Sequence, residues 1–161
     1  MSYRSALASV PQKPVIAACL VVTALVAIWY GWSRYEVCRE RGELSAALRD
    51  WARSTLDGHT RPLEAAAPFV WDEVRIAEGV AETEIAPLAC PFGGHWGKDE
   101  RASLARAGGL TLFGFFAGGR LVALGDFRRD WASFEGVEGA LAREAAVFEA
   151  ADGQTLRPVA Q

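Results

Sequence analysis

The residues best suited to chemistry lie in a glycine-rich stretch that contains Cys90 and His95. A thiol beside an imidazole can form a catalytic pair, and both side chains also bind metals. However, a closed zinc site needs four ligands, and Cys38 and His59 are the other obvious donors, without any close cysteine or histidine pair. Activation of the thiol has no evident source in the sequence. We therefore expect no catalytic residue, no metal and no cofactor.

The same stretch, GGHWGK over 93–98, is similar to a phosphate-binding loop only in part. That loop needs four residues between its glycines and a serine or threonine after the lysine. Here three residues separate Gly93 from Gly97, and Asp99 follows the lysine. The carboxylate pair Glu82/Glu84 and the pair at 99–100 have polar neighbours, which favours a solvated face over acid–base chemistry.

Trp71 and Asp72 are the first candidates for recognition of a partner. In one interpretation, Asp72 pairs with Arg128 or Arg129 in a groove. In the other, Trp71 is a core aromatic and Asp72 holds a turn or a backbone amide. The sequence favours the second interpretation and keeps the first open.

The chain positions these residues behind an uncharged apolar run, Pro14–Trp32. About nineteen residues at roughly 1.5 Å each match a bilayer's hydrocarbon core. A cleaved signal peptide is disfavoured because the run ends in aromatic residues. A lipoprotein signal at Ile16–Cys19 is disfavoured because most of the apolar segment follows the cysteine. We expect an uncleaved membrane helix over 14–33, with the lipid bilayer contacting residues 14–32.

Charge separates this anchor from the rest of the chain. Up to Arg34 there are three basic residues and no acidic one, and the first thirteen residues form a short basic tail. The remaining 14 basic and 20 acidic residues give a net charge of about −6, which argues against a nucleic-acid partner. The positive-inside comparison is close to a tie, although a short basic leader usually stays in the cytoplasm.

The cysteines add a second indication of location. Cys38 and Cys90 could pair in an oxidising compartment, and a disulfide between them would pin the helix after the span to the domain. Free buried cysteines are the alternative. We expect the inner (cytoplasmic) membrane, with the domain on its periplasmic or extracytoplasmic side.

After the span, residues 34–58 predict an amphipathic stalk helix that ends at Asp57-Gly58. Gly42 weakens its middle by about 1 kcal/mol relative to alanine, which favours a bend or break there. The apolar stripe either packs on its own domain or forms a homodimer seam. Its members are Val37, Leu44, Leu48, Trp51 and Thr55.

Residues 59–152 predict a small α+β domain, followed by a flexible tail over 153–161. We expect a first strand over 69–76, with Phe69 and Trp71 on one face and Val70, Val74 and Ile76 on the other. A short helix over 81–89 and a last strand over 145–150 complete the pattern.

The strongest local signal is a β-hairpin, LTLFGFFA-GG-RLVALGDF, whose turn is Gly118-Gly119. Thr111, Phe113 and Phe115 face one way, and Leu110, Leu112 and Phe116 face the other. Because both faces are apolar, either the domain covers both or one meets a partner. Phe113 and Phe115 are therefore candidate partner-binding residues together with Trp71, Asp72, Arg128 and Arg129.

The FVWDEVRI segment, the Gly94-His95-Trp96 triplet and the hairpin ending in Arg128-Arg129 resemble a group of small bacterial envelope domains. The likeness covers about Pro62 to Phe134. Those domains follow the first motif with Pro-Tyr, where this chain has Ala77-Glu78-Gly79. The resemblance implies an envelope location, behind one N-terminal span or a lipoprotein signal, and an α+β fold, and it implies no reaction.

We expect an α+β fold with one N-terminal transmembrane helix, followed by a small antiparallel sheet of three to five strands and one or two helices. The expected function is non-enzymatic: an interaction domain that is accessory to a membrane-protein complex, with a membrane protein as partner. Alternatives are a small envelope enzyme using Cys90, His95 or Asp72, and a lipid or apolar-ligand carrier lined by Phe113, Phe115 and Phe148.

Overall fold

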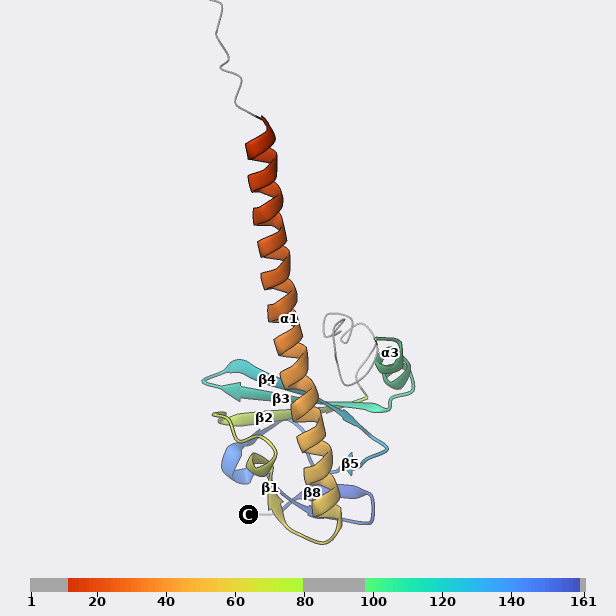
Figure 1. Ribbon diagram of the computed structural model, residues 1–161. Helices are drawn as coiled ribbons and strands as arrows, with labels where there is room; N and C mark the ends of the chain where they lie inside the picture. The colour runs from red at the N-terminus through yellow and green to blue at the C-terminus, as the bar shows by residue number, and fades with distance from the viewer. Residues whose placement is uncertain (1–11, 80–97, 160–161) are drawn as a thin grey trace, which may run out of the picture. The chain divides into compact units, whose positions relative to one another are not determined.

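The computed structural model describes residues 12–79 and 98–159 and contains two compact units, residues 1–34 and 35–161. The first secondary element is one helix, α1 (Gln12–Leu56) (Figure 1). It continues through Gly42, so the expected break there does not occur. It ends as predicted, with Gly58 at a φ of 96°, a conformation that glycine adopts without steric cost.

Within residues 1–34, the large apolar side chains that the structure describes on α1 are exposed. Leu25 and Trp29 are 62% and 72% exposed. Of the described helices, α1 alone is long and apolar enough to cross a membrane. The expectation of one N-terminal apolar helix, long enough to cross a membrane, is confirmed by its length and composition.

The unit of residues 35–161 contains two four-stranded sheets. The hairpin sheet has the order β4-β3-β2-β6, and all its neighbours are antiparallel. Its strands are β2 (Glu73–Glu78), β3 (Leu110–Ala117), β4 (Arg120–Arg128) and β6 (Ala140–Ala142).

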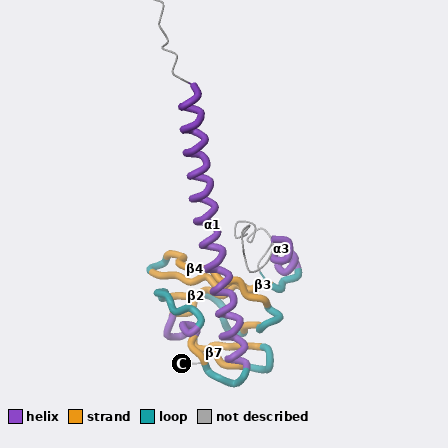
Figure 2. Tube along the Cα trace, in the orientation of Figure 1, coloured by secondary structure: helices purple, strands orange, loops and turns teal. Residues whose placement is uncertain are grey.

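The second sheet has the order β1-β7-β8-β5, with a parallel pair only between β5 and β8. Figure 2 shows strands and helices of this α+β fold, which confirms the expected class with more strands than expected. The strands and the remaining helices are β1 (Arg61–Pro62), β5 (Ser133–Phe134), β7 (Val147–Ala150), β8 (Thr155–Pro158), α3 (Lys98–Arg106) and the short 3-10 helices Leu63–Ala65 and Arg143–Ala145.

The hairpin forms where the sequence predicts it. Gly118 and Gly119 have φ angles of 55° and 74°, which a two-residue turn of this kind requires. The register shifts once, since Phe115 pairs with Ala123 whereas Phe116 pairs with Leu121. One extra residue of β4, Val122, therefore lies in a β-bulge.

Aromatic rings and one side of α1 fill the core between the sheets. Leu48 and Trp51 of α1 are buried there, and the Trp51 ring meets that of Phe148 edge-on at 5.3 Å. Phe113 contacts Phe134 at 5.2 Å. The stalk stripe, except for the exposed Val37, thus packs against its own domain.

Two expectations for single elements need correction. The first strand begins at Glu73 rather than Phe69, and Val70 is 82% exposed although Val74 is buried. The segment expected as a loose tail contains strand β8, because Leu156 is buried in the core. The helix α3 was not expected. The helix expected over 81–89 lies outside the described residues.

Candidate functional site

Trp71 and Asp72 both have structural contacts in the folded unit. The Trp71 indole is buried and donates from Nε1 to the carbonyl of Ala67 at 2.9 Å. Asp72 Oδ2 accepts a hydrogen bond of 2.7 Å from the Gly118 amide, so this carboxylate holds the hairpin turn. The interpretation of a core aromatic and a turn-holding aspartate describes both residues.

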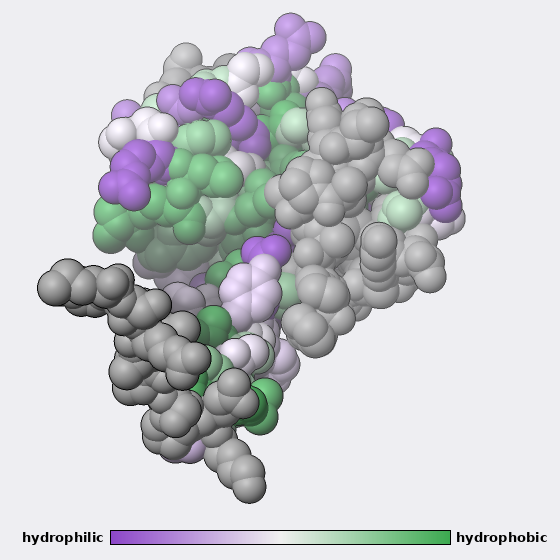
Figure 3. Space-filling model, turned by 90° about the horizontal axis from the view of Figure 1, so that it is seen from above, coloured by the Kyte–Doolittle hydropathy of each residue, from purple (hydrophilic) through white to green (hydrophobic). Residues whose placement is uncertain are grey.

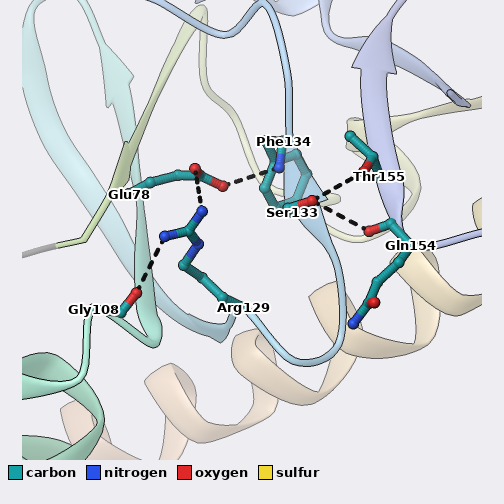
Figure 4. Close-up of polar contacts among 7 residues, drawn as sticks. All are labelled: Glu78, Gly108, Arg129, Ser133, Phe134, Gln154 and Thr155. Atoms are coloured by element: carbon teal, nitrogen blue, oxygen red, sulfur yellow. Dashed lines mark hydrogen bonds and ion pairs between the residues drawn. The ribbon is translucent and has the colours of Figure 1, made fainter. Parts of the chain in front are cut away.

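The two arginines at the end of β4 have other partners. Arg128 makes two hydrogen bonds to the Asp130 carboxylate, from Nε and Nη2. Arg129 Nη2 lies 3.3 Å from Glu78 Oε2, and its Nη1 donates to the carbonyl of Gly108 (Figure 4). Since Asp72 lies at the turn end of the hairpin and these arginines at its open end, the groove interpretation is wrong.

Glu78 links the two sheets at this open end. Its Oε1 accepts from the Phe134 amide of β5 at 2.9 Å, while Oε2 faces Arg129 (Figure 4). Next to it, the hydroxyls of Ser133 and Thr155 are 3.1 Å apart. These contacts close the ends of strands, which is a structural role.

The Asp152 carboxylate organises the β7–β8 turn. It accepts from the amides of Gln154 and Thr155 at 2.8 and 2.6 Å and from the Thr155 hydroxyl at 3.1 Å. The hydrogen bond from the Gln154 amide is the largest cause that lowers the pKa of Asp152, followed by that from the Thr155 side chain. Asp152 is fully exposed.

Phe113 and Phe115, expected as partner-binding residues, are fully buried. Phe115 packs edge-on against Phe69 and Trp71, with ring centroids 5.3 Å apart in each case. These two rings therefore contact the core rather than a partner. Phe148 is buried in the same cluster, so the three rings of the carrier alternative pack on other side chains.

Of the residues with reactive side chains, Cys38 is described and Cys90 and His95 lie outside the described residues. Cys38 is buried and disulfide-bonded, and Cys19 is a free, exposed thiol. Within the described part of the chain, no group of three or more histidine, cysteine, aspartate or glutamate side chains could hold a metal.

The contact that sequence reasoning missed joins α1 to the edge strand β4. Arg41 Nε donates to Asp126 Oδ2 at 2.8 Å, and Arg41 Nη2 donates to Asp126 Oδ1. The Asp126 amide donates to the Ser45 hydroxyl at 3.1 Å. All three residues are buried. A signal existed, because Arg41 lies four residues after Val37 and three before Leu44, on the apolar stripe itself.

The accessible apolar side chains of the hairpin lie on its other face. A Cβ added to Gly114 would lie 3.2 Å from Cε2 of Phe116 and 3.5 Å from Cδ1 of Leu121, so both side chains converge over this glycine. Leu121 and Val122 are 54% and 49% exposed. Figure 3 shows hydrophobic residues gathered here, with hydrophilic residues at their border. We name this the hairpin surface: Phe116, Arg120, Leu121, Val122 and Leu124.

No protein-family model, curated protein or solved structure matches this chain.

Proposed function

We propose that this chain is a single-pass membrane protein that presents a small, non-enzymatic interaction domain and serves as an accessory subunit of a membrane-protein complex. The observation that carries the proposal is the uncovered apolar half of α1. A soluble domain would leave this surface in water, whereas a bilayer buries it. Trp29, Tyr30 and Trp32, at the end of the run, suit a membrane interface.

The location that fits best is the inner (cytoplasmic) membrane, with the folded unit on the extracytoplasmic side. The short basic leader favours a cytoplasmic N-terminus. The disulfide of Cys38 supports the same side, because disulfides persist in oxidising compartments. A Cys90→Ser variant of the full chain tests the expected pairing: in denaturant, which exposes the buried Cys38, its thiol should react with maleimide only in this variant or after reduction. Reaction of Cys38 in the unreduced wild-type chain would contradict it.

The tether and the structural contacts of the polar residues support the accessory role. A tether to the bilayer raises the effective concentration of the domain near other membrane proteins. Asp72, Arg128, Arg129 and Asp152 hold turns and strand ends in the structure, which leaves these four side chains engaged in the fold. A membrane protein is the expected partner, because the tether keeps the domain at the bilayer surface where such proteins are encountered.

Co-purification in mild detergent tests the partner. The tagged full chain is compared with a chimaera that keeps residues 1–34 and carries an unrelated soluble domain in place of 35–161. The same membrane protein should co-purify in repeated preparations with the full chain and be absent with the chimaera. Equal recovery of all membrane proteins with both chains would overturn the accessory role.

A charge in the apolar half tests the anchor. Leu25→Arg should weaken membrane integration, because an arginine at a helix centre costs about 2.5–3.5 kcal/mol of insertion free energy. The measurement is the fraction of intact chain that remains in the pellet after carbonate washing. Ala151→Arg, in the exposed β7–β8 turn, is the matched control and should stay in the pellet like the wild type. Release of the wild-type chain by carbonate would refute the anchor.

A further inference from the structure

The side of the folded unit at which α1 enters is defined by three contacts along the helix. Trp51 lies in the core between the sheets. One to two turns earlier, Leu44 and Leu48 lie against Gly125 of the edge strand β4. Earlier still, Arg41 binds the Asp126 carboxylate. The helix therefore passes the edge of the hairpin sheet from the core side outward.

The outward direction is that of the hairpin surface. Side chains alternate along β4, and Gly125 faces the core side, where α1 covers it. Asp126 and Leu124 therefore point to the outer face, as do their register partners Leu112 and Gly114. Since Arg41 meets Asp126 on this face, Tyr35 and the start of the folded unit lie on the same side of the sheet as the hairpin surface.

The chain length between this entry point and the apolar run is small. Only Ser33 and Arg34 separate Trp32, the last residue of the run, from Tyr35. If Trp32 lies at the membrane interface, the entry side of the folded unit is held at the headgroups. This step rests on the proposed anchor and on no particular orientation of residues 1–34.

The chemistry of the hairpin surface fits an interface between water and lipid. Leu121 and Val122 offer exposed aliphatic side chains, and Arg120, next to them, offers an exposed guanidinium. The Arg75 guanidinium lies 4.6 Å from the ring centre of Phe116, so a second cation borders the apolar side chains. Aliphatic groups partition into the acyl boundary, and arginines bind headgroup phosphates from its edge.

We propose that the hairpin surface inserts Leu121 and Val122 into the headgroup region of the membrane that α1 crosses, with Arg120 bound to lipid phosphate. Two aliphatic residues alone would bind a bilayer weakly. The tether makes the contact intramolecular, which raises its occupancy without new contacts. The lipid contact is a second attachment of the folded unit and fixes which of its other faces a partner can reach.

Spin labels on the full chain test this contact. The chain, in a Cys19→Ser background, carries a nitroxide at Leu121→Cys and is reconstituted into vesicles of phosphatidylcholine and phosphatidylglycerol. Ala151→Cys, in the β7–β8 turn of the other sheet, is the control. We expect power saturation to show several-fold lower accessibility to a nickel chelate, and higher accessibility to oxygen, at 121 than at 151. Val122→Cys provides a second label if the first variant unfolds at lower denaturant than the wild type.

Two results would overturn the proposal. Equal nickel accessibility at 121 and 151 would show that the hairpin surface stays in water. Protection at 121 that grows with the protein-to-lipid ratio would assign the surface to a second copy of the chain. Vesicles of phosphatidylcholine alone separate the aliphatic contribution of Leu121 and Val122 from the electrostatic contribution of Arg120. Without anionic lipid, Arg120 should contribute less and the protection at 121 should be weaker. The vesicles contain no other protein, so a negative result for the lipid contact leaves the co-purification result unaffected. A failure of the proposed anchor would be seen separately, as chain that does not float with the vesicles.

Discussion

The two halves of α1 differ in apolar content and in burial, and the two properties run in opposite directions. Residues 14–32 carry no charge, yet their described large side chains are exposed, as at Leu25. Residues 35–56 are rich in arginine and glutamate, yet Leu48 and Trp51 in this half are buried. A helix packs on a protein core through a stripe at helical spacing, whereas uniform hydrophobicity fits a solvent that is apolar on all sides.

The buried half also shows what a charge requires inside a protein. Arg41 lies on the apolar stripe, and its buried guanidinium binds the Asp126 carboxylate. The Asp126 amide in turn donates to the Ser45 hydroxyl. Arg39, two residues earlier, pairs with Glu43 at the surface. The position of a charged residue on the helix, rather than its type, therefore decides how much free energy of unfolding is lost when its ion pair is broken.

The largest expected effect comes from the buried ion pair. Asp126→Asn removes the carboxylate that binds the buried Arg41 guanidinium and should lower the free energy of unfolding by about 3–5 kcal/mol. The matched control is Arg39→Gln, which breaks the exposed pair with Glu43 and should cost about 0.3–0.5 kcal/mol. Denaturant unfolding of the full chain in detergent, followed by tryptophan fluorescence, measures both. A similar loss of unfolding free energy in the two variants would contradict the idea that an ion pair on the buried stripe contributes more than one on the exposed face.

Leucine truncation in each half tests the difference directly. Leu48→Ala removes a fully buried side chain and should cost about 2–5 kcal/mol in the unfolding of residues 35–161. Leu25→Ala, at a position 62% exposed, leaves no cavity in the folded unit and should not change the same transition. The same unfolding assay serves, and a loss of stability from Leu25→Ala would show that the apolar half packs on the protein.

Part of this fold can be predicted from the sequence because the causes are local. The Gly118-Gly119 turn, the end of α1 at Gly58 and the spacing of the helix stripe each depend on neighbouring residues. Other features depend on distant partners. Arg41 and Asp126 are 85 residues apart, so the stripe position of Arg41 indicates a buried partner without naming it.

The candidate site was harder to predict for the same reason. Phe69–Asp72 has the alternation of a strand, but the Trp71 indole bonds to Ala67 and the Asp72 carboxylate to the hairpin turn, which fixes a non-strand path. The short β8 has weak propensity and forms because Leu156 enters the core. The hairpin surface depends on a β-bulge at Val122, which appears in the register and in no sequence pattern.

A glycine in each unit gives a smaller and more selective test. Gly125→Ala would place a Cβ 2.6 Å from Cδ1 of the fully buried Leu48, and overpacking of this kind costs about 1–3 kcal/mol. Gly31→Ala, in the apolar half, meets nothing within 4 Å and should leave unfolding unchanged. If Gly125→Ala is neutral, the α1–β4 contact is looser than its geometry indicates.

The smallest effect separates hydrogen bonding from burial, since Asp152 accepts several hydrogen bonds as Asp126 does but is fully exposed. Its pKa is lowered in the folded chain, so its contribution to stability is present above the unfolded-state pKa and is lost as the pH falls through the lowered folded-state value. Asp152→Asn should remove this acid dependence together with the small contribution that the carboxylate makes at neutral pH. The measurement is the pH titration of the Gln154 and Thr155 amide shifts by NMR. A loss of neutral-pH stability as large as that of Asp126→Asn would mean that hydrogen bonds alone, without burial, set the cost of losing a carboxylate in this protein.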